Sequence, residues 1–184
     1  MWLILLDASG SMGDVFEGTS SFRGRTHLTE AAVKLQAAKE ALLEHLEGLG
    51  SATQIAIFEF RESATLCYTG PSDDLGSVRA VLDGIEPGGG TDAAAALRAA
   101  RDHIDAHTQE VVFRVLIIAD GLSDAAAAEL AGRDLLARRV PIDFVLIDVT
   151  PKGEDLARKV SGSVGTVRGG MPLAMPGPQC APRL

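Results

Sequence analysis

The sequence predicts an α/β fold: a doubly wound, mostly parallel sheet with one antiparallel edge strand and helices on both faces. Short apolar runs and longer amphipathic segments alternate along the 184 residues, as in chains whose helices connect parallel strands. The apolar runs are continuous, which is typical of strands covered on both faces. Two strand-like segments are separated only by "RES", a link too short for anything but antiparallel neighbours.

The first half of the chain is expected to hold a strand, a helix, the antiparallel pair and a second helix. In the first helix, leucine and alanine recur every three or four residues, with Lys34 and Lys39 largely off that stripe. Ser72 or Asp73 would cap the second helix. The expected elements are a strand at residues 2–6, a helix at 28–49, strands at 53–60 and 64–69, and a helix at 73–85.

The second half continues the alternation. The run "VVFRVLIIA" is the strongest strand signal in the chain, and an alanine-rich helix precedes it. Proline and glycine are too frequent in residues 169–184 for a regular element, so we expect a flexible tail after a single domain of residues 1–168. The expected elements are a helix at residues 91–107, a strand at 111–119, a helix at 123–139, a strand at 141–147, a helix at 153–160 and a strand at 163–168.

Composition narrows the class of protein and its partners. The hydrophobic content of 46% is enough for a full core. The formal net charge of −8 argues against nucleic acid or an anionic membrane as the main partner. No apolar run is long enough for a signal peptide core or a membrane span. Cys67 and Cys180 lie far apart, so we expect no structural disulfide and a reducing, cytoplasmic location.

Oxygen-bearing side chains gather where the first strand ends. Asp7, Ser9 and Ser11 occupy alternate positions directly after the apolar run. Three interpretations compete: a helix N-cap, an aspartate that accepts a phosphoryl group, and one wall of an oxygen-only metal site. If the last is right, another strand must end in a site residue at the same edge of the sheet.

Two further segments meet that condition. The strand at 111–119 ends at Asp120, which is followed by Gly121, and three glycines lead into Thr91 at the start of a helix. Each residue has an alternative role, because a threonine before a helix is commonly an N-cap and an aspartate before glycine is commonly a turn residue. Their combination with the first segment favours a shared site.

These segments resemble the von Willebrand factor type A family, on "DASGSM", "GGGTDAAAAL" and "LIIADG" in that order. The resemblance extends from residue 2 to about residue 167. It implies a metal-ion-dependent adhesion site, in which serines contact the metal directly, one or both carboxylates act through water, and a Glu or Asp of a partner takes an open position. The five residues of that site would be Asp7, Ser9, Ser11, Thr91 and Asp120.

The donor chemistry predicts the cation. Three neutral hydroxyls and two carboxylates form a hard, all-oxygen set that suits Mg²⁺, or Mn²⁺, rather than zinc. Asp148 follows the strand at 141–147 on the same rim and is a candidate for tuning the site, with a simple turn role as the alternative. The polar link at residues 14–27 is longer than a minimal domain needs, and covering the metal face, shaping partner choice and disorder all remain open for it.

The function expected from this site is metal-dependent protein binding, without enzyme activity. The resemblance implies an intracellular domain of a multi-protein assembly, with an AAA+ ATPase or a stress or defence component as partner. Arginine in preference to lysine, with abundant alanine and glycine, hints at a bacterial, GC-rich genome. The alternative is a Mg²⁺-dependent phosphohydrolase or phospho-acceptor domain using Asp7, but Ser9 stands where such an enzyme needs a second acid.

Overall fold

A computed structural model describes residues 1–16, 20–22, 25–27, 32–51, 53–107, 111–148, 150–161 and 163–167. The expected tail at residues 169–184 lies outside this part of the chain. None of the helices in the described part is both long and apolar enough to cross a membrane. The thiol of Cys67 is free, and Cys180 lies outside the described residues.

The central layer is a mostly parallel sheet, which confirms the predicted fold class. Within the described residues six strands pair in the order β10-β9-β8-β1-β6-β7, and only β6 and β7 run antiparallel. The short "RES" link therefore joins the antiparallel pair at the sheet edge, as the sequence predicts. The strands are β1 (Trp2–Asp7), β6 (Gln54–Phe60), β7 (Ala64–Pro71), β8 (Arg114–Ala119), β9 (Ile142–Ile147) and β10 (Ser163–Val167).

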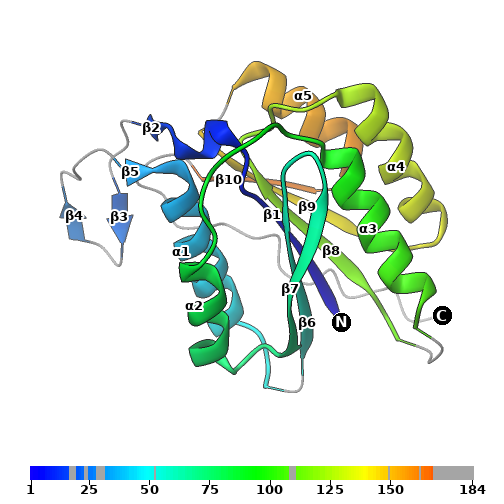
Figure 1. Cartoon of the computed structure of the whole chain (residues 1–184), viewed down its shortest axis with the longest axis horizontal. Helices are drawn as coiled ribbons and strands as arrows, with labels where there is room; N and C mark the ends of the chain where they lie inside the picture. The colour runs from blue at the N-terminus through cyan, green and yellow to red at the C-terminus, as the bar shows by residue number, and fades with distance from the viewer. Residues whose placement is uncertain are drawn as a thin grey trace.

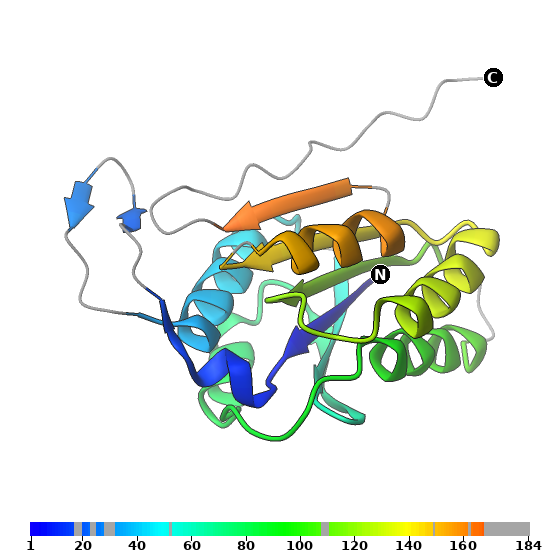
Figure 2. The same cartoon turned by 90° about the horizontal axis from the view of Figure 1, so that it is seen from above.

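The direction of strand addition reverses at β1, which lies between β6 and β8. Trp2 of β1 is aligned with Ile55 of β6 on one side and with Arg114 of β8 on the other, and both pairings are parallel. Figure 2 shows the arrowheads of β1, β8 and β9 at the same edge of the sheet. In open α/β sheets the ligand site lies outside the carboxyl ends of the strands at such a reversal.

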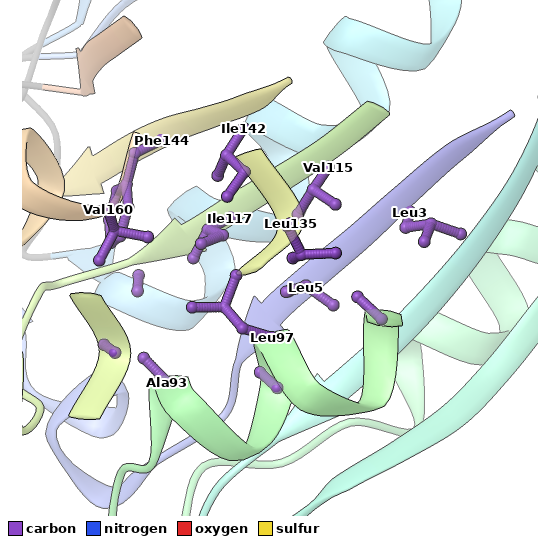
Figure 3. Close-up of a cluster of buried hydrophobic side chains, with 14 of the residues drawn as sticks. Leu3, Leu5, Ala93, Leu97, Val115, Ile117, Leu135, Ile142, Phe144 and Val160 are labelled. Carbon is purple, nitrogen blue, oxygen red and sulfur yellow. The ribbon is translucent and has the colours of Figure 1, made fainter. Parts of the chain in front are cut away.

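Five helices cover the two faces of the sheet (Figure 1). Leu3 and Leu5 of β1 pack in one core cluster with α3, α4 and α5 (Figure 3), whereas Ile4 and Leu6 pack on the opposite face with α1 and α2. Because successive strand side chains point to opposite faces, a strand covered on both sides must be apolar throughout. The helices are α1 (Lys34–Glu47), α2 (Leu75–Asp83), α3 (Ala93–Asp105), α4 (Ala125–Ala137) and α5 (Pro151–Val160).

The first helix starts later than the periodicity predicts. Residues 28–31 lie outside the described part, and Ala32–Val33 form the short strand β5, so α1 begins at Lys34 instead of at residue 28, where the predicted range 28–49 starts. Lys34 is also buried, which corrects the interpretation that it lies off the apolar stripe. Its backbone N–H donates to the carbonyl of Asp14 at 3.1 Å, which anchors the start of the helix.

Aspartates cap the next three helices, each of which begins two residues later than predicted. Asp74, and neither Ser72 nor Asp73, caps α2, because its carboxylate accepts from the backbone N–H of Ser77 at 3.2 Å. Asp92 caps α3 in the same way, so Thr91 does not serve as that cap. In α4 the cap is Asp124.

The polar link after the first motif contains short strands of its own. A 3₁₀ turn, η1 (Gly10–Gly13), is followed by β2 (Val15–Phe16), which pairs antiparallel with β5. The strands β3 (Ser20–Phe22) and β4 (Arg25–His27) form a second antiparallel pair. Figures 1 and 2 show this pair projecting outward beyond α1, away from the sheet.

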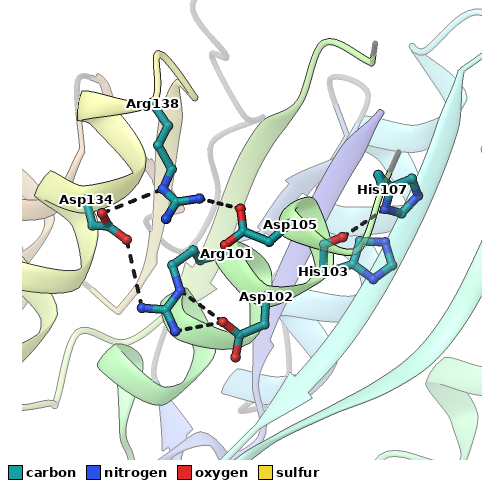
Figure 4. Close-up of polar contacts among 7 residues, drawn as sticks. All are labelled: Arg101, Asp102, His103, Asp105, His107, Asp134 and Arg138. Carbon is teal, nitrogen blue, oxygen red and sulfur yellow. Dashed lines mark hydrogen bonds and ion pairs between the residues drawn. The ribbon is translucent and has the colours of Figure 1, made fainter. Parts of the chain in front are cut away.

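Arginines and aspartates link the carboxyl-terminal ends of α3 and α4 (Figure 4). Arg138 pairs with Asp105 and Asp134, and Arg101 pairs with Asp102 and, at 3.9 Å, with Asp134. These side chains are 33–67% exposed, and ion pairs at such positions contribute little to stability. We therefore expect Arg138→Ala to change Tm by less than about 3 °C in differential scanning calorimetry. A larger drop would show that the network is a principal link between the two helices.

Candidate metal centre

The first group of predicted site residues lies together at the end of β1. Asp7 and Ser9 are buried, and the backbone N–H of Ser9 donates to Asp7 Oδ1 at 2.8 Å. The hydroxyl oxygens of Ser9 and Ser11 are 3.2 Å apart, because the η1 turn curls the chain back after Ser9. One carboxylate and two hydroxyls are thus held side by side.

Asp120 follows β8, the neighbour of β1, and is also fully buried. The backbone N–H of Leu122 donates to its Oδ1 at 3.1 Å. The second oxygens, Asp7 Oδ2 and Asp120 Oδ2, are buried without a hydrogen-bond partner among the described residues. Asp120 Oδ2 forms an ion pair with Lys34, whose Nζ lies 3.5 Å away. The site therefore presents two carboxylate oxygens that lack their usual donors.

The charge of Asp7 is strongly disfavoured in the metal-free protein. Burial raises the pKa of this carboxyl to about 7, although hydrogen bonds from Ser9 act in the opposite direction and lower the pKa. The nearby charge of Asp120 raises the pKa further, and Lys34 partly opposes that effect. A bound cation would stabilise a buried carboxylate such as Asp7, whose charge is disfavoured by burial and by a neighbouring carboxylate.

Thr91 is placed through its backbone. The hydroxyl of Ser123 donates to the carbonyl of Thr91 at 3.5 Å and accepts from the N–H of Ala93 at 3.0 Å. Ser123 stands three residues after Asp120, so this contact joins the segment before α3 to the segment after β8. Hydrogen bonds join Ser9 to Asp7 and to Ser11. Asp120 follows the neighbouring strand and acts on Asp7 through its charge, while Thr91 lies on the adjoining loop.

The loops of the site are tied to one another by backbone hydrogen bonds. The N–H of Gly10 donates to the carbonyl of Gly89 at 3.0 Å, and the N–H of Gly88 donates to the carbonyl of Ala8 at 2.9 Å. Gly89 has a φ of +73°, which suits glycine in this tight turn. The glycine-rich turn before Thr91 is therefore pinned directly to the first motif.

Sequence reasoning missed an arginine that braces these loops. Arg61 Nε donates to the carbonyl of Ala8 at 3.2 Å, and its Nη2 donates to the carbonyl of Glu86 at 2.7 Å. The neighbouring Glu62 accepts from the N–H of Gly90. Both residues belong to the "RES" link, which sequence reasoning treated only as a turn; nothing in its pattern signalled the contact.

Lys34 is the second residue that sequence reasoning missed. Its ammonium nitrogen lies 3.5 Å from Asp120 Oδ2 and 3.0 Å from Asp148 Oδ2. A lysine in the first turn of a helix, with no acidic residue beside it there, opposes the helix dipole. The sequence prediction started this helix at residue 28, so it gave no such signal. Asp148, proposed from sequence to tune the site, lies within the same ion-pair cluster.

The donor set fits a hard divalent cation. The described residues contain no cluster of three or more His, Cys, Asp and Glu side chains that could hold a metal. The predicted ligand set does not depend on such a cluster, since it combines serine and threonine hydroxyls with two carboxylates. Buried carboxylate oxygens without hydrogen-bond donors, next to two hydroxyls, provide oxygen ligands of the type that Mg²⁺ and Mn²⁺ prefer.

One sequence family matches the part of the chain that carries these residues. The family described as the von Willebrand factor type A domain matches residues 2–122, a range that contains all five predicted site residues. The chain belongs to this family. No curated protein sequence matches it. Family members generally act as protein-interaction modules, so this von Willebrand factor type A (VWA) domain is assigned to that general class.

Solved structures share the fold of the VWA domain at low sequence identity. BatB from Bacteroides thetaiotaomicron, a conserved hypothetical protein, has a TM-score of 0.69 and 17% identity over 91% of this chain and 90% of its own. An aerotolerance-related membrane protein from Bacteroides fragilis has a TM-score of 0.65 and 17% sequence identity, and the match covers 89% of each chain. A von Willebrand factor type A protein from Catenulispora acidiphila has a TM-score of 0.66 and 21% sequence identity, and the match covers 91% of this chain and 38% of its own.

Proposed function

We propose that this VWA domain binds a partner protein through a divalent cation, Mg²⁺ or Mn²⁺, to which the partner presents a Glu or Asp side chain. The observation that carries the proposal is a pair of buried oxygens at the carboxyl ends of adjacent parallel strands, Asp7 Oδ2 and Asp120 Oδ2, for which the described part of the chain offers no hydrogen-bond donor. The ligands would be Asp7, Ser9, Ser11, Thr91 and Asp120.

The carboxylates and the hydroxyls of the site would contribute differently to that function. Asp7 at the end of β1 and Asp120 just after β8 would supply negative charge from buried positions, and the hydroxyls of Ser9 and Ser11 would supply neutral oxygens. A bound Mg²⁺ offers a Lewis-acidic position to a carboxylate oxygen of another protein. With only two carboxylates in the set, an incoming acidic side chain is electrostatically favoured, and such charge-assisted contacts give specificity at interfaces.

The loop connections support this interpretation, because a binding site has to hold its ligands still. The bonds between Gly10 and Gly89, and from Arg61 to Ala8, fix the first motif against the glycine-rich turn. Pre-organised ligands lose little conformational entropy on binding.

We expect metal binding to depend on a hydroxyl as well as on a carboxylate. Ser9→Ala should weaken binding of Mg²⁺ or Mn²⁺ by roughly tenfold or more, since even outer-shell changes at metal sites commonly cost that much. Asp120→Ala should be worse because it also removes charge. Isothermal titration calorimetry with MgCl₂ and MnCl₂ measures both. Ser51→Ala and Asp73→Ala are the matched controls, because both positions are exposed and lie near the amino end of β6, at the opposite edge of the sheet. Unchanged affinity in both site variants would refute the ligand assignment.

Partner binding is tested by chelation and restoration. The immobilised domain is incubated with native lysate in MgCl₂, in EDTA, and in EDTA followed by excess MgCl₂. Proteins captured only with Mg²⁺ by the wild type, and lost with Ser9→Ala, are the candidate partners. AAA+ ATPases and stress or defence components of a cytoplasmic assembly are the first expected classes. Replacing the partner's critical Glu or Asp by its amide should weaken binding about as much as EDTA does, whereas equal capture in EDTA would mean that another face is used.

We further propose that the site is not catalytic. The residue two positions after Asp7 is Ser9, whose hydroxyl contacts Ser11, so it supplies no carboxyl for acid catalysis. A Mg²⁺-dependent phosphatase assay should therefore show no turnover; activity that is lost with Asp7→Asn would favour the phosphohydrolase instead.

A further inference from the structure

A lysine side chain occupies the acidic rim of the site. Lys34 is the first residue of α1 and is 7% exposed. Its Nζ lies 3.0 Å from Asp148 Oδ2 and 3.5 Å from Asp120 Oδ2, so one ammonium bridges two carboxylates. Because Asp120 Oδ2 has no hydrogen-bond donor among the described residues, this ion pair is the principal compensation of its charge there.

The placement of Lys34 opposes two general tendencies. Burial disfavours a charged ammonium, and the amino-terminal end of a helix repels positive charge. The carboxylates of Asp148 and Asp120, 3.0 Å and 3.5 Å from Nζ, compensate the ammonium against both effects.

Asp148 adopts an uncommon backbone conformation beside Lys34. It follows β9 with a φ of +57°, in the left-handed region that residues other than glycine rarely enter. In this conformation its carboxylate reaches Lys34, although 41% of the side chain remains exposed. The ion pair is thus built from the start of α1 and the end of β9, two segments that flank the rim.

We propose that Lys34 is the internal counter-cation of this site: its ammonium compensates Asp120 and Asp148 in the metal-free protein and competes with a divalent cation for Asp120. The inference rests on the proposed metal site. It assigns to Lys34 control of metal affinity, a role distinct from that of a ligand. In the metal-free domain the ammonium of Lys34 compensates the buried carboxylate of Asp120. A cation that binds at Asp120 has to overcome the repulsion of this fixed positive charge.

This role predicts opposite effects for removing the two members of the pair. Lys34→Met should tighten Mg²⁺ and Mn²⁺ binding by about tenfold or more, because a buried unit charge close to the ligands is weakly screened. Asp148→Asn should weaken metal binding, since it removes a negative charge and leaves Asp120 as the one remaining carboxylate of the pair around Lys34. The double variant should return toward the wild-type affinity.

Thermal stability gives a second readout. In EDTA, Lys34→Met should lower Tm by roughly 5 °C or more, because removing one partner of a buried ion pair leaves the other uncompensated. Saturating MgCl₂ should recover most of that loss, so the shift in Tm between EDTA and MgCl₂ becomes larger than in the wild type. Lys39→Met is the matched control, since Lys39 lies on the same helix and donates to the carbonyl of Ile85 at 2.7 Å.

The experiment is a titration with MgCl₂ and MnCl₂ by calorimetry, together with melting curves of the four variants and the wild type. Unchanged or weaker metal binding in Lys34→Met overturns the inference, because Lys34 would then be structural or would position Asp120 for the metal. If the wild type binds metal and Lys34→Met is unchanged, the proposed function stands and only the inference fails. If only Lys34→Met binds metal, the inference stands and the wild-type function fails; if neither binds, both fail. Should Lys34→Met not fold, the direction of the Asp148→Asn effect decides.

Discussion

Gly121→Ala is expected to destabilise the domain by about 3 kcal/mol or more, lowering Tm by roughly 10 °C. Gly121 has a φ of +80°, where a side chain strains the backbone, and an added Cβ would lie 2.3 Å from Gly153 Cα. That neighbour is backbone of the first turn of α5, so it cannot rotate away as a flexible side chain would.

The same substitution should disturb the metal site, because Gly121 directly follows Asp120. Calorimetric melting measures the loss of stability, and Mg²⁺ titration at a temperature where the variant is folded measures the effect on the site. Gly88→Ala is the control: Gly88 lies on a neighbouring loop of the same rim, and an added Cβ there meets no atom within 4 Å. A Tm within about 2 °C of the wild type for Gly121→Ala would show that α5 moves away easily.

Most of the fold follows from local pattern. Alternation of apolar runs with amphipathic segments predicts the sheet and its helices, and the short "RES" link predicts the antiparallel edge. Helix starts are less predictable, because several polar residues precede each helix and only the geometry selects the cap. Asp74 and Asp92 accept from the N–H groups three residues ahead, although the sequence offers Ser72, Asp73 and Thr91 as equally good caps.

The candidate site is predictable only in part, for a physical reason. Asp7, Ser9 and Ser11 are neighbours in sequence, and Asp120 ends the adjacent parallel strand, so topology alone places them at one edge. Contacts made by long side chains across the fold carry no such local signal. Arg61 reaches the carbonyls of Ala8 and Glu86, and Lys34 reaches Asp120, over distances in sequence that periodicity does not describe.

The buried carboxylate of Asp7 is expected to make the metal-free domain less stable as pH rises. Its pKa is raised from 3.8 to about 7, chiefly by burial. The protonated form is therefore favoured in the folded state, and its stabilising contribution is complete below pH 3.8 and is lost as pH rises through about 7. Across that window the free energy of unfolding should fall by about 1.4 kcal/mol per pH unit from this group.

Asp7→Asn is expected to remove that penalty and the metal site together. The amide is neutral and keeps an oxygen that can accept from the N–H of Ser9, so in EDTA at pH 8 the variant should be more stable than the wild type, by on the order of 4 kcal/mol at most. Near pH 4 the two proteins should have similar stabilities, because the wild-type carboxyl is then protonated. Urea unfolding at several pH values measures the difference, in which the contributions of all other titrating groups cancel.

Magnesium completes the test, because it should reverse the order of the two proteins. At pH 8 saturating MgCl₂ should stabilise the wild type, whose ionised Asp7 is compensated by the cation, and should leave Asp7→Asn unchanged. The Mg²⁺ stabilisation of the wild type should shrink as pH falls below about 7, since protons and the cation compete for the same carboxylate.

An Asp7→Asn protein that is less stable than the wild type in EDTA at pH 8 would mean that the ionised carboxylate is already well compensated without metal. Equal Mg²⁺ stabilisation of both proteins would exclude Asp7 as a ligand, and the charge argument for the site would then rest on Asp120 alone.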